Sequence, residues 1–144
     1  MEWMKAIVDY GILGLLTMMS VFAVSIAIER HLFFRKIILS DFSDLKSLEI
    51  TLTRKLHILA TIASNAPYVG LLGTVLGIML IFYTMGQQGF MDTGKIMVGL
   101  ALAMKATAAG LLVAIPVITF YNILLRRVKE IIHAWEAQRE SQDD

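Results

Sequence analysis

Charged side chains are missing from three long stretches of this 144-residue chain, and their absence limits what the chain can fold into. Residues 10–28 carry no charge, residues 56–91 carry no Asp, Glu, Lys or Arg, and residues 96–125 carry only Lys105. A helix of about 20 mostly apolar residues crosses the hydrocarbon core of a bilayer. The gaps therefore predict an all-α membrane protein with three spanning helices, at about 10–28, 67–85 and 98–125.

The composition agrees with a membrane protein: 57% of the residues are hydrophobic, 17% are charged, and none is cysteine. A soluble domain usually carries about a quarter charged residues. The absence of cysteine excludes a disulfide framework and thiolate chemistry, and the high hydrophobicity excludes a disordered chain. The chain has no motif of a serine hydrolase, a zinc protease, a nucleotide-binding loop or a redox pair. We therefore expect no enzyme, no cofactor, no metal site and no nucleic-acid partner.

The orientation of the spans follows from Lys and Arg, which are enriched on the cytoplasmic side of a membrane. Residues 29–57 contain six basic side chains and residues 126–144 contain four, whereas residues 1–9 and the turn 86–95 contain one each. The first span is no signal peptide, because most of its flanking basic residues follow the apolar core. We expect one domain over residues 1–144, with the N-terminus outside and both basic segments in the cytoplasm.

Both cytoplasmic segments are predicted to add helices to the bundle. Leucines at positions 45, 48, 52 and 56 follow polar residues typical of a helix start, and we expect this helix to run on toward the second span. In the tail, Val128, Ile131, Ile132 and Trp135 form one apolar stripe. The stripe favours a helical extension of the third span that packs on neighbours, with a helix on the membrane surface as the alternative.

Small residues recur at helical spacing in the second and third predicted spans. They are Gly70, Gly73 and Gly77 in the second span, and Ala103, Ala106, Gly110 and Ala114 in the third. Small residues let helix backbones approach closely in lipid, where burial of apolar surface contributes little to association. We therefore predict a tightly packed helix assembly. Because three spans cannot enclose a wide pathway, we also predict a homo-oligomer.

Few polar residues lie deep in the predicted spans. Thr74 and Thr107 lie near the middle of spans two and three, where each hydroxyl could simply bond to a carbonyl of its own helix. Lys105 lies about 10 Å from the outer end of span three at helical rise. It either snorkels to the outer surface or faces a carboxylate in or beside a pore. No Asp or Glu lies within a span, so a carboxylate that carries protons across the membrane would have to come from a partner.

Two stretches resemble signatures of the MotA/TolQ/ExbB proton-channel family. Residues 66–79, APYVGLLGTVLGIM, resemble the signature of its second span, and residues 100–117, LALAMKATAAGLLVAIPV, resemble that of its third. Pro67 and Pro116 lie within these stretches, and we count both with the helix-packing residues. The combination is most similar to the ExbB branch, in a short form, because the flagellar MotA branch has a fourth span and a much larger cytoplasmic loop.

The resemblance implies a stator subunit of the bacterial inner membrane that uses the proton motive force. It implies a pentamer around a central pore, an ExbD-like single-span partner in that pore, and a TonB-like protein that energises outer-membrane transport. Thr74 and Thr107 match the family's pore threonines, while the proton-carrying Asp belongs to the ExbD-like partner. Leu102 stands where ExbB members commonly carry a Glu, three residues before Lys105. A TolQ-type role in the Tol-Pal envelope system and a non-conducting membrane scaffold are the alternatives.

Overall fold

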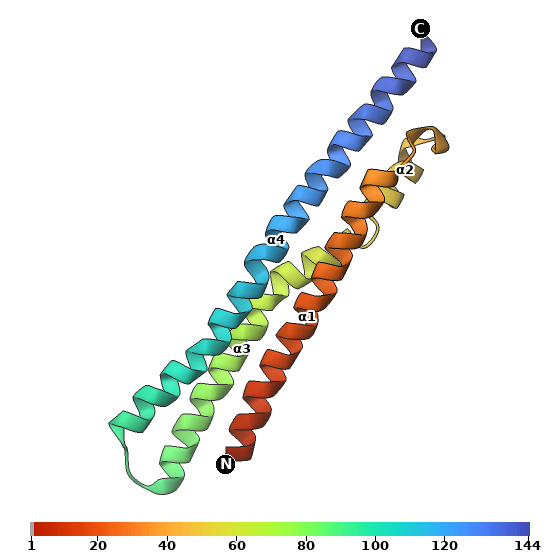
Figure 1. Ribbon diagram of the computed structural model, residues 1–144. Helices are drawn as coiled ribbons and strands as arrows, with labels where there is room; N and C mark the ends of the chain where they lie inside the picture. Colours follow the sequence, from red (N-terminus) through yellow and green to blue (C-terminus); the bar gives the residue numbers. More distant parts are fainter. Residues whose placement is uncertain (1) are drawn as a thin grey trace.

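The computed structural model describes residues 2–144 as an elongated bundle of helices. Its elements are α1 (Glu2–Lys36), the short 3-10 helix η1 (Leu39–Asp41), α2 (Leu45–Thr53), α3 (Leu56–Gln88) and α4 (Thr93–Asp143). Figure 1 shows α1, α3 and α4 as long rods lying side by side, with α3 antiparallel to the other two. The beginning of α1 and the turn between α3 and α4 share one end of the bundle, which we call the N-terminal end.

Each of the three long helices is long and apolar enough to cross a membrane, which agrees with the predicted number of spans. The helices extend well past the apolar stretches, since α1 has 35 residues and α4 has 51. The tail after residue 125 is a continuous part of α4, as the prediction of an extended third helix requires.

The structure differs from the sequence prediction at the junction of α2 and α3. Instead of running on as one helix, the chain ends α2 at Thr53 and begins α3 at Leu56. Between them Lys55 adopts a left-handed backbone conformation with φ of 69°. The lost helical hydrogen bonds are offset by contacts with α1, because Arg30 donates to the carbonyl of Thr51, in the last turn of α2.

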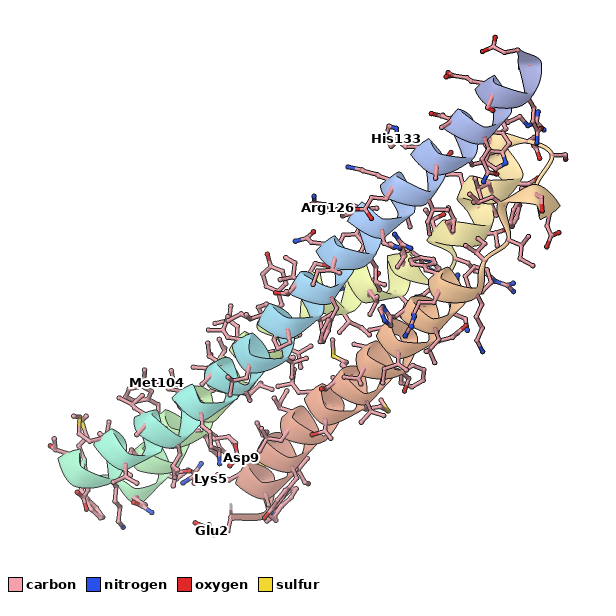
Figure 2. All side chains as sticks on the ribbon, turned by 45° about the horizontal axis from the view of Figure 1, so that its top comes forward. Glu2, Lys5, Asp9, Met104, Arg126 and His133 are labelled. Atoms are coloured by element: carbon pink, nitrogen blue, oxygen red, sulfur yellow. The ribbon has the colours of Figure 1, made fainter. Side chains whose placement is uncertain are left out.

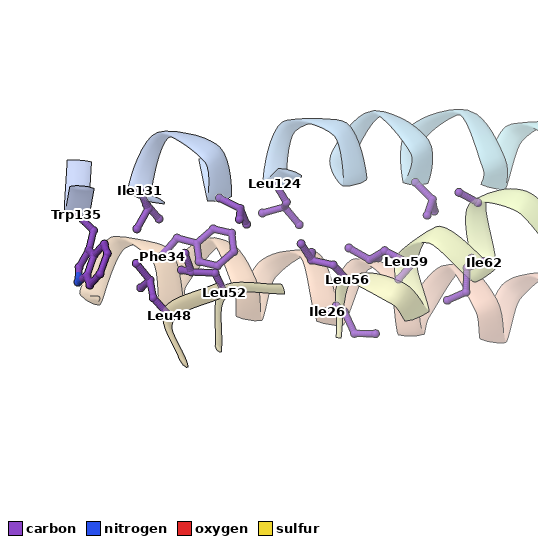
Figure 3. Packing of buried hydrophobic residues seen from close by; sticks show 14 residues of the cluster. Ile26, Phe34, Leu48, Leu52, Leu56, Leu59, Ile62, Leu124, Ile131 and Trp135 are labelled. Carbon is purple, nitrogen blue, oxygen red and sulfur yellow. The ribbon is translucent and has the colours of Figure 1, made fainter. Parts of the chain in front are cut away.

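The C-terminal end of the bundle holds the larger apolar core, in which α2 lies against both α1 and α4 (Figure 3). Leu48, Leu52 and Leu59 are fully buried there. The apolar stripe of the tail faces this core, and the indole Nε1 of Trp135 donates to the carbonyl of Phe42 at 3.2 Å. The tail therefore packs on its own chain.

Candidate functional site

The backbones of α3 and α4 come into contact where two glycines face each other. A Cβ atom added to Gly70 would lie 2.6 Å from the carbonyl oxygen of Ala106 and 3.1 Å from the Cα of Gly110. A Cβ added to Gly110 would lie 2.6 Å from the carbonyl oxygen of Ala66. Real Cβ atoms do not approach backbone oxygens this closely, so only glycine fits at both positions.

The close contact continues toward the N-terminal end of the bundle. A Cβ added to Gly73 would lie 2.7 Å from the Cβ of Ala106 and 2.9 Å from a methyl group of Ile12, so α1, α3 and α4 meet at this residue. A Cβ added to Gly77 would lie 2.9 Å from the Cβ of Ala103. The small residues singled out in the sequence thus face one another across α3 and α4.

The sequence predicts helix packing for three further residues, which are Ala114, Pro67 and Pro116. Ala114 is buried in the same apolar cluster as Ile12 and Leu16 of α1. Pro67 is half-buried within α3, and Pro116 is exposed on α4. Pro116 therefore does not join the contact between α3 and α4. Figure 1 shows the first turns of α3 running at an angle to the rest of the helix, and a bend of this kind is what a proline inside a helix causes.

The approach of the two helices brings the hydroxyl groups of Thr74 and Thr107 together. Their Oγ1 atoms lie 2.5 Å apart, and the Oγ1 of Thr74 also lies 3.0 Å from the carbonyl oxygen of Ala103. The carbonyl of Gly70 on its own helix is more distant, at 3.4 Å. With one proton per hydroxyl, both bonds form if Thr74 donates to Ala103 and Thr107 donates to Thr74.

Other helical threonines show what a purely local hydroxyl does in this chain. Thr17, Thr84 and Thr119 each donate to the carbonyl four residues earlier, at 2.8 Å. Thr74 instead makes its shorter bonds across to α4. Its hydroxyl therefore joins the two helices, which the sequence alone could not decide. A paired hydroxyl can hold a water molecule or pass on a hydrogen bond, but it carries no charge of its own at neutral pH.

The hydroxyl pair lies on the side of the interface turned away from α1. Figure 2 shows Met104 on the side of α4 opposite α1, and Thr107 lies one turn further along the same face. On α3, Gly73 faces Ile12 of α1, and Thr74 is rotated by about 100° from it. Within one chain, α1 therefore leaves the hydroxyl pair uncovered.

Lys105 does not join the hydroxyl pair within one chain. It precedes Thr107 by two residues, which places it about 200° around α4. Its side chain is exposed, and none of the ion pairs formed within residues 2–144 includes it. The single chain thus brings together Thr74, Thr107 and the glycine contact, and leaves Lys105 on another face.

Asp9 directly precedes the first uncharged stretch, residues 10–28. In the structure, Asp9 is half-buried and lines a cavity of about 40 Å³ together with Lys5 and Leu102. Figure 2 shows Lys5 and Asp9 in the space between α1 and the other two long helices. Helical spacing is the sequence signal for this placement, because Asp9 lies three residues before the apolar Ile12 and so shares its helix face.

Within residues 2–144, no cluster of three or more His, Asp or Glu side chains is placed to hold a metal ion. Three long apolar helices, close-packed through small residues, define a multi-pass membrane protein. A sequence model described as the MotA/TolQ/ExbB proton channel family matches residues 33–137. The chain therefore belongs to this family, which is a family of proton-channel and transport subunits.

Curated relatives agree with the family and with the ExbB branch. The chain is 55% identical over 137 residues to the biopolymer transport protein ExbB of Aquifex aeolicus (strain VF5), covering 95% of this chain and 93% of the relative. It is 53% identical over 127 residues to an ExbB of Helicobacter pylori (strain J99 / ATCC 700824), covering 88% of each. A putative ExbB-like 2 protein of Helicobacter pylori (strain ATCC 700392 / 26695) is 51% identical over 133 residues, which cover 92% of this chain and 89% of that protein. Because each alignment covers most of both chains, these relatives are about as short as this chain.

Proposed function

We propose that the chain is an ExbB-type stator subunit of the bacterial inner membrane, which uses the proton motive force to energise transport across the outer membrane. It acts as a homopentamer with its N-terminus outside and its C-terminus in the cytoplasm. An ExbD-like single-span partner occupies the central pore, and a TonB-like protein receives the force. The contact between Thr74 and Thr107 is the observation that carries this proposal.

The hydroxyl pair suits a pathway whose titratable group comes from elsewhere. It supplies hydrogen-bonding groups at depth in an apolar helix pair, and hydroxyls can orient water without trapping a proton. A proton carrier in a membrane normally uses a carboxylate or histidine. In the proposed complex the carboxylate belongs to the single-span partner, which lies against the hydroxyl face of each copy.

Large apolar side chains around the hydroxyl pair support an oligomer. Leu71 of α3 and Met104 and Leu111 of α4 lie on the side turned away from α1, and they are 49%, 63% and 45% exposed in the single chain. In a ring, these surfaces meet the partner helix and neighbouring copies. The remaining apolar surface faces lipid, which accepts it without cost.

Removal of the hydroxyls tests the proposed pathway. Thr74→Val and Thr107→Val keep the shape of each side chain and remove its hydroxyl, so we expect proton-driven uptake to fall by tenfold or more, about 1.4 kcal/mol or more. Thr119→Val is the matched control, because the exposed Thr119 bonds only to its own helix. Uptake is measured in cells that lack the natural subunit, together with the mass of the purified complex with and without its single-span partner.

Two results would contradict the proposal. Undiminished uptake in both valine variants, with assembly intact, would show that Thr74 and Thr107 do not form the proton pathway. A purified chain that stays monomeric with its partner present would exclude a pore formed by several copies.

A further inference from the structure

Arg30 is the one charged side chain that is buried among the residues the structure describes, with 5% of its surface exposed. It lies near the end of α1, just beyond the first predicted span. A buried guanidinium is costly unless it is paired and hydrogen-bonded. The partners of Arg30 therefore show what its burial achieves.

The guanidinium of Arg30 connects α1 to the last turn of α2. Its Nη1 donates to the carbonyl of Thr51 at 3.0 Å, and its Nη2 lies 3.4 Å from the carboxylate of Glu29. Its central carbon lies 4.5 Å from the ring centre of Phe33, a cation–π contact. The carbonyls in the last turn of a helix have no partner within the helix and carry partial negative charge. Arg30 thus caps the C-terminus of α2 from the neighbouring helix.

Glu29 connects the same point of α1 to the beginning of α3. Its second carboxylate oxygen lies 2.7 Å from the ammonium of Lys55, the residue with positive φ that precedes α3. A hydrogen bond from Lys55, with the charges of Lys55 and Arg30, holds the pKa of the Glu29 carboxyl below its usual value of 4.5. Two adjacent residues of α1 therefore contact both sides of the break between α2 and α3.

We propose that Arg30 is a positioning residue, which with Glu29 and Lys55 forms a clamp that sets the direction of α3 and thereby the contact of Thr74 with Thr107. The first turns of α3 connect this clamp to the segment that begins at Pro67, and Figure 1 shows these turns running at an angle to the rest of the helix. A displaced start of α3 changes the approach of the helix to α4 further along, where the glycine contact has no spare space. The link to activity rests on the proposed function, whereas the clamp itself does not.

Charge reversal tests the clamp at its two partly exposed members. Glu29→Lys should destabilise the junction of α2 and α3 most, because the new ammonium repels both Arg30 and Lys55. Lys55→Glu should destabilise the junction less. The double reversal restores an opposite pair and should recover at least half of the loss.

Reversal of Arg127 and Glu130, an exposed pair on α4 with atoms 3.2 Å apart, is the matched control. Arg30→Lys keeps the charge but loses the planar fork that reaches Thr51 and Glu29 together. It should therefore also destabilise the junction of α2 and α3.

Two measurements separate the clamp from the proposed function. Amide hydrogen exchange of the purified complex should be roughly threefold faster or more in α2 and the first turns of α3 in each single reversal. Proton-driven uptake should fall in the same variants at unchanged complex mass. Unchanged exchange, or a double reversal no better than the single ones, would overturn the clamp. Faster exchange with normal uptake would overturn its role in positioning Thr74. If the unaltered complex shows no proton-driven uptake, the proposed function fails while the exchange data still decide the clamp.

Discussion

Single atoms decide how closely α3 and α4 approach. A methyl group at Gly70 would meet the backbone of α4, whose carbonyl oxygen cannot move without moving the helix. The distance between the Thr74 and Thr107 hydroxyls is therefore tied to the absence of a side chain one turn away. Thr74 and Gly70 form one structural unit, in which glycine supplies the space and threonine supplies the hydrogen bond.

Gly70→Ala should lower the stability of the complex and also weaken the hydroxyl contact. Overpacking at a tight contact costs about 1–3 kcal/mol, and we expect a lower thermal midpoint of the purified complex together with reduced uptake. Gly86→Ala is the control on the same helix, since a Cβ there would meet nothing within 4 Å. Alanine is also the better helix former, so this control should be neutral or stabilising. Equal midpoints for the two variants would show that α3 and α4 have room that the structure does not contain.

At the scale of elements, α4 has two tasks along its 51 residues. One part packs against α3 through small residues, and the part that follows packs against α1 and α2 through large ones such as Ile131 and Trp135 (Figure 3). The tail is thus a second interface of the same helix. It closes over the segment between α1 and α2, where Trp135 bonds to Phe42.

Trp135 should determine how firmly the segment between α1 and α2 is held. Trp135→Phe removes the indole N–H bonded to Phe42 and should cost about 1 kcal/mol. Trp135→Ala also removes a buried ring and should cost about 3–5 kcal/mol. The measurement is the rate of limited proteolysis in residues 38–44, with His133→Ala as the control, because the exposed His133 points away from the bundle (Figure 2). A cleavage rate in Trp135→Ala equal to that of the control would show that the tail does not close this end.

At the scale of the whole molecule, local sequence patterns predict the helices, whereas features that depend on contacts between distant residues cannot be predicted from them. The three long apolar helices follow from gaps in charge, and the facing of Gly70 and Gly110 agrees with helical spacing alone. The break between α2 and α3 does not follow from a local pattern, because its contacts join Arg30 to Thr51 and Glu29 to Lys55, which are 21 and 26 positions apart in the sequence. Arg30 illustrates the same limit: it counted toward the orientation of the spans, and only the packed structure shows that it is buried.

The role of Lys105 depends on the proposed arrangement of several copies of the chain. Within one chain it lies about 200° from Thr107 around α4, on a face that the other helices of the chain leave exposed. We therefore expect Lys105→Met to retain the assembled mass and to change proton-driven uptake by no more than about twofold, or roughly 0.4 kcal/mol. Lys95→Met, at the exposed start of α4, is the control for loss of one basic side chain at the N-terminal end. If Lys105→Met abolishes uptake in a complex of normal mass, the ammonium acts on the pathway of a neighbouring copy or on the partner's carboxylate. The face of α4 that carries Lys105 would then have to turn inward in the ring.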